Sequence, residues 1–329
     1  MQILIRNGQV VDPAAGTVQK ADVLVEDGKI EKIAPEIREE AAHVLEAEGC
    51  YVMPGFIDLH VHLRDPGLEY KETLATGGQA AVKGGVTTVV AMPNPLPPID
   101  DGEKYKAVTE RAAQESPAHV LQLGAVTRGQ KGEELSDIEG MAHAGCVGLS
   151  EDGKSVMNAS LYRQAMKIAR DQGMTVFAHC EDINMVEGGV MNADENAGRL
   201  GMKGITNSVE DVIVARDILL AKETGVKLHL CHCSTADSVK MVELAKKAGL
   251  PVTAEVCPHH FILTSGDIPG DDADYKMNPP LRTRQDVEEL RRGLREGIMD
   301  VIATDHAPHG AKEKQQSMAK APFGIVGLE

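Results

Sequence analysis

Two histidines spaced two residues apart, His60 and His62, are the first feature of the sequence that could do chemistry. They lie in residues 55–66, GFIDLHVHLRDP, where apolar residues dominate as in a buried strand. Alternate side chains of a strand share one face, so two imidazoles would leave the strand end side by side. Such a pair can bind one metal ion. An isolated pair, however, is more often two ordinary core or surface histidines, so the rest of the chain must decide between the two interpretations.

Further candidate ligands follow later apolar segments of the chain. Each stands at or just after the end of a predicted strand: Asp152, His179, His232 and Asp305. Imidazole with carboxylate suits zinc, and cobalt or manganese could substitute. Six protein ligands are too many for one tetrahedral zinc, which favours two ions that share a bridging carboxylate. Each residue alone has a plainer explanation, such as a core histidine or a turn former, but their joint placement at five strand ends favours a metal centre.

Eight short apolar segments are predicted as strands, with helices between most of them. The strands are residues 56–62, 86–92, 119–125, 146–150, 175–179, 227–232, 252–256 and 300–304. The helices are residues 72–83, 158–171, 208–223, 235–248 and 284–295, with Asn158 or Ser160, Ser208 and Thr235 as candidate N-caps. Eight strand and crossover units predict an α/β fold, a (β/α)8 TIM-like barrel whose active site lies at the C-terminal strand ends. A doubly wound open sheet competes, but no glycine-rich phosphate loop follows any strand.

The N-terminal segment has a different pattern. Residues 2–11, 22–25, 29–33 and 43–47 read as strands, and Asp27-Gly28 is a hairpin signal because such turns need positive φ angles. We therefore expect two domains: a small β-sandwich part over residues 1–54 and a metal-dependent hydrolase barrel over residues 55–329. The β-sandwich part is too small to be stable alone.

Composition excludes several classes of function. The chain has 329 residues, with 34 Lys+Arg against 50 Asp+Glu and a formal net charge of −16. A nucleic-acid partner needs a basic face, which this balance disfavours. No signal peptide or bilayer-spanning apolar run is evident. The six cysteines form no CxxC pair, so we expect reduced thiols in a cytoplasmic protein.

Four motifs give the sequence a family resemblance. They are DLHVHLRDP at residues 58–66, MPNPLPP at 92–98, MNPPLR at 277–282 and ATDHAPH at 303–309, the last followed by Lys314. In these motifs the sequence resembles the type I dihydroorotases of the amidohydrolase superfamily, over essentially the whole chain. The resemblance implies zinc-dependent, reversible conversion between (S)-dihydroorotate and N-carbamoyl-L-aspartate, a step of de novo pyrimidine (UMP) biosynthesis.

The resemblance also implies a metal-binding role for six residues. Two zinc ions per chain would be bound, one by His60, His62 and Asp305 and the other by His179 and His232, with Asp152 and a hydroxide bridging them. The hydroxide would attack the substrate, and Asp305 would act as general base and then acid. Relatives such as hydantoinases bridge with a carboxylated lysine instead, and this sequence has no lysine at the bridging place.

Substrate contacts follow from the same resemblance. Arg64, Asn94 and His309 would bind the substrate carboxylate and Asn278 its ring, whereas His259 and His260 would be structural. A guanidinium can grip a carboxylate with two hydrogen bonds, and a local cation offsets the negative charge of the whole chain.

Some alternatives stay open. The chain could be another cyclic amidohydrolase, such as a hydantoinase or allantoinase, or a non-catalytic relative that supports aspartate carbamoyltransferase. Arg64 and Asn94 argue against the first, and the full set of six candidate ligands argues against the second. Homodimer formation and a complex with aspartate carbamoyltransferase are both undecided. Chains of this family continue beyond the point where residues 322–329 end this one, so we expect a truncated barrel that is less stable and less active than a complete chain.

Overall fold

The computed structural model describes residues 1–329, and the chain divides into two compact units, Met1–Phe56 and Ile57–Glu329. The division falls at the start of the strand that carries the paired histidines, so every candidate site residue belongs to the larger unit. In neither unit is there a helix whose length and apolar character would let it cross a membrane.

The smaller unit is a single mixed sheet. Its strands are β1 Gln2–Asp12, β2 Thr17–Glu26, β3 Lys29–Ala34, β4 His43–Glu46 and β5 Tyr51–Val52. The order is β3-β2-β1-β4 with β5 also on β1; β1, β2 and β3 are antiparallel, and β4 and β5 run parallel to β1. The predicted hairpin turn is confirmed, because Asp27 and Gly28 have φ angles of 48° and 78°. The assignment of residues 1–54 to a β-sandwich part stays a prediction.

The larger unit is built on parallel strands, as predicted. They are β6 Phe56–Val61, β7 Val86–Ala91, β8 His119–Gln122, β9 Gly124–Ala125, β10 Gly148–Ser150, β11 Thr175–Ala178, β14 Lys227–Leu230, β15 Val252–Val256 and β16 Val301–Ile302. The sheet orders are β6-β7-β8 and β16-β15-β14-β11-β10-β9. The backbone N–H of His62 donates to His306 O at 2.8 Å, which joins the segment after β16 to the end of β6 and closes the ring. The (β/α)8 barrel is thus confirmed, although the predicted strand 119–125 is interrupted at Leu123.

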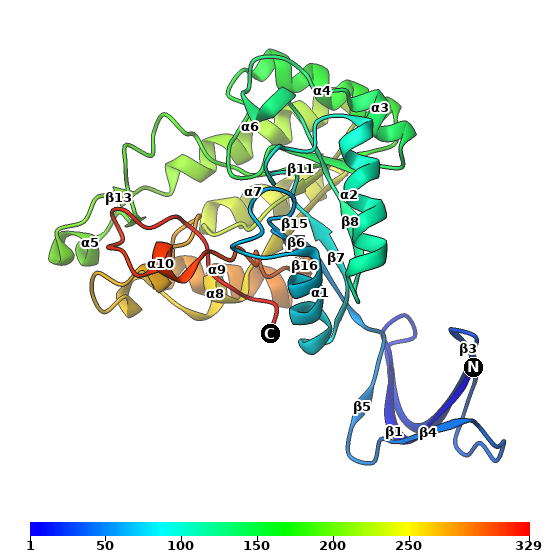
Figure 1. The fold of residues 1–329 in the computed structure, drawn as a ribbon. Helices are drawn as coiled ribbons and strands as arrows, with labels where there is room; N and C mark the ends of the chain where they lie inside the picture. Colours follow the sequence, from blue (N-terminus) through cyan, green and yellow to red (C-terminus); the bar gives the residue numbers. More distant parts are fainter. The chain divides into compact units, whose positions relative to one another are not determined.

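Helices surround these strands (Figure 1). The helices that follow successive strands are α1 Leu74–Lys83, α2 Gly102–Glu115, α3 Ile138–His143, α4 Ala159–Asp171, α6 Ser208–Thr224, α7 Ala236–Lys247 and α9 Arg284–Arg295, and α10 Ala311–Lys314 follows β16. Three of them, α2, α3 and α10, were not predicted. Only Tyr105, Val108 and Ala112 of α2 are buried, a stripe too narrow to stand out among its charged residues, and α3 has only six residues.

Alternation along the strands builds two apolar layers. Val89 and Val176 belong to the large core cluster that includes the helix residues, whereas their neighbours Val90 and Phe177 belong to a separate cluster. Successive side chains of a strand point to opposite faces, so each strand is buried on both. This continuous apolar wall holds the strand ends, and the polar side chains beyond them, in fixed positions.

The predicted helix caps are partly confirmed. Asn158 accepts hydrogen bonds from the backbone of α4, and Thr235 accepts one from Ser238 N at the start of α7. The prediction for Ser208 is wrong: α6 begins at Ser208 and its N-cap residue is Asn207. The Asn207 side chain donates to Asp286 Oδ1 at 3.0 Å instead of capping the helix, so a tertiary contact has replaced the local one.

Two excursions leave the barrel on the side of the strand ends. Between β11 and α6 lie β12 Met191–Asn192, α5 Glu195–Leu200 and β13 Gly204–Ile205; between β15 and α9 lie α8 Pro258–Ile262 and the 3-10 turns η2 Ser265–Asp267 and η3 Ala273–Tyr275. The Arg282 side chain ties the excursions to the barrel and is 1% exposed. It donates to Asn192 Oδ1 at 3.1 Å, Ile205 O at 2.9 Å and Ser234 Oγ at 3.0 Å, and its Nη2 lies 3.6 Å from Glu210 Oε2.

Replacement of Arg282 by Met should lower the free energy of unfolding by about 3–5 kcal/mol, because Glu210 would keep a buried charge without its partner. Urea unfolding followed by circular dichroism measures the change. Arg284→Met is the matched control, since Arg284 is exposed on the same segment. A loss below about 1 kcal/mol for Arg282→Met would show that the buried network is not holding the excursions.

Candidate metal centre and substrate pocket

The structure gathers all six predicted ligands at the C-terminal ends of the barrel strands. His60 lies on β6 and His62 one residue beyond it, and the others follow later strands: Asp152 after β10, His179 after β11, His232 after β14 and Asp305 after β16. All six are buried. Because the strands are parallel, their ends meet at one edge of the barrel, and residues far apart in the chain come together there.

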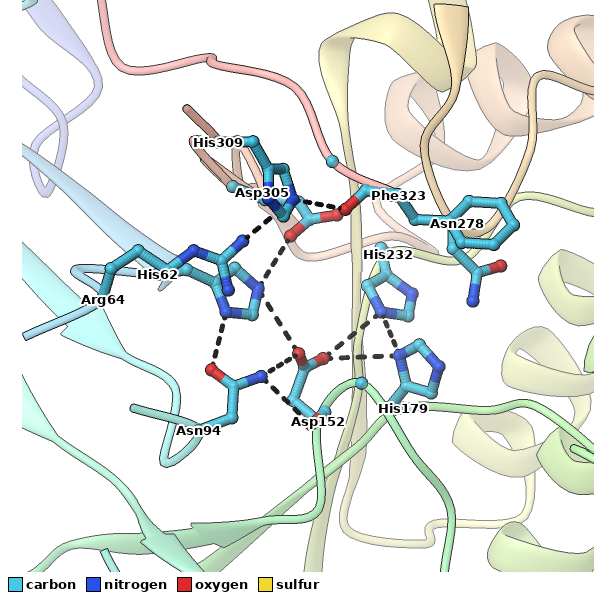
Figure 2. Close-up of a pocket in the computed structure, with 13 residues that line it drawn as sticks. His62, Arg64, Asn94, Asp152, His179, His232, Asn278, Asp305, His309 and Phe323 are labelled. Atoms are coloured by element: carbon cyan, nitrogen blue, oxygen red, sulfur yellow. Dashed lines mark hydrogen bonds and ion pairs between the residues drawn. The ribbon is translucent and has the colours of Figure 1, made fainter. Parts of the chain in front are cut away.

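Asp152 is the centre of the cluster. Its Oδ1 lies 3.3 Å from His60 Nε2, 3.4 Å from His179 Nδ1 and 3.6 Å from His232 Nε2, and its Oδ2 lies 3.3 Å from His62 Nε2. Figure 2 shows this carboxylate between the imidazoles of His62, His179 and His232. A single carboxylate therefore touches all four predicted histidine ligands.

The remaining ligands fall into two groups on either side of Asp152. Asp305 Oδ1 lies 3.2 Å from His62 Nε2 and 3.5 Å from His60 Nε2. On the other side His179 Nδ1 lies 2.9 Å from His232 Nε2. Inward-facing ring nitrogens and carboxylate oxygens at such distances are donor atoms that suit one metal ion in each group.

Two observations show that this donor set fits cations. His60 Nε2 and Asp152 Oδ1 are buried side-chain atoms without a hydrogen-bond partner, which is rare in protein interiors. Asp152 and Asp305 also place two carboxylates against the same His62 nitrogen, and buried like charges are costly unless cations neutralise them. The residues present therefore fit a metal centre.

A second row of polar groups fixes which ring nitrogen faces inward. His60 Nδ1 lies 2.7 Å from Glu255 Oε1, His179 Nε2 lies 3.2 Å from Glu181 Oε2, and His62 Nδ1 lies 2.9 Å from Asn94 Oδ1. Hydrogen bonds of this kind orient ligand imidazoles and make them better donors to a metal. We did not predict Glu255 or Glu181 from the sequence. The signals were present, since Glu255 is the one charged residue in the strand Val252–Val256 and Glu181 follows His179 by two residues.

The electrostatic field of the centre is negative. Burial alone would raise the pKa of Glu255, but the His60 and His229 imidazoles hold it well below its usual range. Burial alone would lower the pKa of His179, but the carboxylates of Asp152 and Glu181 raise it to about 10. The field that attracts a proton to this imidazole also favours a metal cation in its place.

Backbone strain concentrates at the same edge. Arg64, His232 and Asp305 have positive φ angles of 61°, 34° and 50°, a conformation that non-glycine residues rarely adopt. Strained residues of this kind persist where the surrounding structure over-determines them, often at functional sites. Here the strained backbone directs three predicted site residues towards the same edge of the barrel.

A cavity of about 220 Å³ opens beside the cluster (Figure 2). Its lining is His62, Arg64, Asn94, Asp152, Gly153, His179, His232, Asn278, Asp305, Ala307, His309, Phe323 and Gly324. All four predicted substrate contacts are in this lining. The volume suits a small molecule, and Arg64 gives the wall a permanent cation opposite the acidic cluster.

The predicted substrate residues are already held by the protein. Asn94 Nδ2 donates to Asp152 O at 3.1 Å, and Asn278 Nδ2 donates to Glu181 Oε1 at 2.9 Å. Asn94 therefore supports the metal centre as well as lining the cavity. Arg64 is anchored by its Nε, which donates to Pro308 O at 3.1 Å.

His259 and His260 lie outside the cluster of six. His260 is buried and its Nε2 donates to Pro279 O at 2.8 Å, while the two rings pack with centroids 4.2 Å apart. The cysteine before them, Cys257, brings its sulfur within 4.8 Å of both rings' candidate ligand atoms. The contact with Pro279 supports the predicted structural role of His260.

Comparison with known proteins identifies the family. A family model described as dihydro-orotase-like matches residues 49–238. A dihydroorotase of Pelotomaculum thermopropionicum is 49% identical over 329 residues, which is 100% of this chain and 77% of that protein. The chain belongs to the dihydroorotase family. A dihydroorotase of Halalkalibacterium halodurans is 48% identical over the same shares of both chains, so this dihydroorotase-family chain spans about three quarters of the length of these relatives.

Solved structures agree on the fold of this dihydroorotase-family chain. L-Hydantoinase (dihydropyrimidinase) from Arthrobacter aurescens is 26% identical with a TM-score of 0.85, over 99% of this chain and 74% of that one. D-Hydantoinase (dihydropyrimidinase) from Thermus sp. is 26% identical with a TM-score of 0.82 over the same shares. The resemblance seen in the sequence motifs is therefore confirmed at the level of family and fold.

Replacement of Glu255 by Gln should weaken metal binding by about 10- to 100-fold, because the amide orients His60 less firmly and removes a negative charge. Competition with a chelator dye measures the metal dissociation constant. Glu133→Gln, at an exposed position, is the control. Equal affinities for the two variants would contradict the supporting role of Glu255.

Proposed function

We propose that this chain is a dihydroorotase, which opens the ring of dihydroorotate to N-carbamoyl-L-aspartate and closes it in the biosynthetic direction. The observation that carries the proposal is that two features meet at one cavity: a cluster of imidazoles and carboxylates, of which all but His60 line the cavity, and the guanidinium of Arg64. The first suits hydrolysis of a cyclic amide, and the second suits a substrate that bears a carboxylate. The dihydroorotases that are 48–49% identical support the same conclusion.

We infer that the cluster would hold two zinc ions. His60, His62 and Asp305 would bind one, His179 and His232 the other, and Asp152 would lie between them; the contacts of Asp152 with all four imidazoles support this arrangement. Zinc in such a centre would supply Lewis acidity, which makes water a nucleophile near neutral pH and polarises a carbonyl oxygen.

Asp305 would move the proton. Its Oδ1 faces His60 and His62, which leaves Oδ2 free to accept a proton from the attacking water. Burial alone would raise the pKa of Asp305, but those two imidazoles hold it well below its usual range, so the group is ionised at neutral pH. Once protonated, it would give the proton to the ring nitrogen as the carbon–nitrogen bond breaks.

Arg64, His309 and Asn278 would orient the substrate. Arg64 and His309 lie on the same wall of the cavity, with Arg64 Nη2 3.5 Å from His309 Nε2, and both would bind the carboxylate. Asn278, which also lines the cavity, would contact the ring amide of the substrate. Asn94 would reach the same carboxylate, although its amide already contacts both His62 and Asp152.

A hydantoinase is the second candidate, because the solved structures at 26% identity are hydantoinases. The two candidates differ in the substrate that they fit. Hydantoin carries no carboxylate, so the half-buried Arg64 would have no anionic partner in it, at a cost in desolvation. Assembly as a homodimer or with aspartate carbamoyltransferase, and a cytoplasmic location, stay predictions from the sequence.

The substrate comparison tests the proposal. Purified zinc-loaded protein should turn over dihydroorotate with a kcat/KM at least about 100-fold higher than for hydantoin or allantoin, because only dihydroorotate satisfies Arg64. Ring opening is followed by the loss of ultraviolet absorbance. Preference for hydantoin would favour the second candidate, and zinc-loaded protein that acts on none of the three would contradict both.

Asp305→Asn should reduce kcat by about 10³-fold or more, since the amide keeps the shape of the carboxylate and cannot accept the proton. Metal content and circular dichroism, measured on the same sample, separate loss of the proton acceptor from loss of metal or fold. An unchanged kcat would refute the assignment of Asp305 as the proton carrier.

Arg64→Met should raise KM for dihydroorotate by about 10- to 100-fold with a smaller effect on kcat, because a hydrogen-bonded charge pair with the substrate is lost. Steady-state kinetics gives both parameters. Arg128→Met is the control, because Arg128 lies on the surface with 66% of its side chain exposed. Equal KM values for the two variants would exclude a contact between Arg64 and the substrate carboxylate.

A further inference from the structure

Lys71 contacts the candidate site although it does not line the cavity. It lies in the loop between β6 and α1, and its side chain is only 11% exposed. Its Nζ is 3.0 Å from His309 Nδ1 and 3.2 Å from Glu313 Oε1. A lysine buried against a histidine that lines the cavity is a contact that neither the sequence motifs nor the metal centre accounts for.

The contact determines where His309 carries its proton. A lysine ammonium can only donate hydrogen bonds, so His309 Nδ1 must accept and cannot carry a hydrogen. The neutral ring then has its proton on Nε2. A second contact gives the same result independently: Nε2 lies 2.7 Å from the carbonyl oxygen of Phe323, which can only accept.

The proton on Nε2 points to the wall where an anion would bind. Arg64 Nη2 lies 3.5 Å from His309 Nε2, and Figure 2 shows both groups on one side of the cavity. Two hydrogen-bond donors that face each other cannot bond to one another, and both are satisfied only when an acceptor lies between them. Burial, and then the nearby Arg64 charge, lower the pKa of His309 to about 4, so the ring is neutral at physiological pH.

We propose that Lys71 is a positioning residue for substrate recognition: by donating to His309 Nδ1, it holds the imidazole in the Nε2–H form that donates to the substrate carboxylate beside Arg64. The inference rests on the proposed function for the identity of the anion. Its structural half, the tautomer of His309 set by Lys71, stands without it. Binding of the carboxylate exchanges the Phe323 carbonyl for a charged acceptor, which makes a stronger hydrogen bond.

A purely structural role for Lys71 would act through its ion pair with Glu313. The structure separates this role from the positioning of His309. Glu313 keeps other partners without Lys71, because Tyr70 Oη donates to its Oε1 at 3.2 Å and Gly310 N donates to its Oε2 at 2.8 Å. His309 Nδ1 has only Lys71 as a donor, since its other neighbour, Glu313, is a carboxylate 3.9 Å away. Loss of Lys71 should therefore change the hydrogen bonding of His309 more than it changes the conformation of the loop that holds Lys71.

The first experiment reads the tautomer directly. Nitrogen-15 NMR of substrate-free, histidine-labelled protein distinguishes a protonated from an unprotonated ring nitrogen, and the His309→Asn variant assigns the signals. The wild type should show His309 with hydrogen on Nε2. Lys71→Met should add a population of the Nδ1–H form that the wild type lacks, while the Phe323 carbonyl still favours the Nε2–H form in the remainder; Lys71→Gln, whose amide can still donate, should retain more of the Nε2–H form.

The second experiment reads the consequence for recognition. Lys71→Met should raise KM for dihydroorotate about tenfold or more while kcat changes by less than about threefold, the effect of one weakened hydrogen bond to a charged group. Lys71→Gln should lie closer to the wild type. Lys83→Met is the matched control, because Lys83 also pairs with a glutamate but is exposed on the surface.

The outcomes separate the inference from the proposed function. A wild-type His309 with hydrogen on Nδ1 overturns the inference without any variant. So does a Lys71→Met protein that changes the tautomer but not KM, or KM but not the tautomer. If wild-type protein shows the Nε2–H form yet fails to act on dihydroorotate, the proposed function fails while the control of the tautomer by Lys71 is retained.

Discussion

The site depends on one buried carboxylate in contact with four imidazoles. Asp152 holds that place because it follows β10, which pairs with β9 and β11 in the parallel sheet, and because the ends of β6, β11 and β14 bring the four histidines to the same edge of the barrel. A carboxylate and four ring nitrogens excluded from water are stable together only if charge is balanced locally, which cations accomplish and hydrogen bonds alone do not. The barrel therefore positions a centre whose donor atoms suit metal cations.

The outer contacts explain why the centre has one geometry. Glu255 Oε1 accepts hydrogen bonds from His60 Nδ1 and from the backbone N–H of His232, so a single buried acid fixes residues from two strands. Lys71 acts in the same way on the cavity wall, where it fixes the far nitrogen of His309. In both cases a charged group behind the imidazole determines which nitrogen faces the chemistry.

The sequence predicted the fold and the gathering of the six candidate ligands because both depend on local signals. Strand ends are marked by the change from apolar to polar residues, and a parallel barrel brings those ends together whatever lies between them. Contacts behind the candidate ligands were not predicted, because they depend on side-chain orientation across neighbouring strands. The contacts of Glu181 and Glu255 can be recognised only when the positions of the imidazole rings are known. Helix α2 was missed for a related reason, since tertiary packing rather than its own polar sequence makes it a helix.

The most direct test of the central claim is a crystal structure of the zinc-loaded protein, with data collected on both sides of the zinc absorption edge. We expect two anomalous peaks on either side of the Asp152 carboxylate, one beside His60, His62 and Asp305 and the other beside His179 and His232. Only one peak, or peaks remote from Asp152, in protein that opens the dihydroorotate ring would contradict that claim.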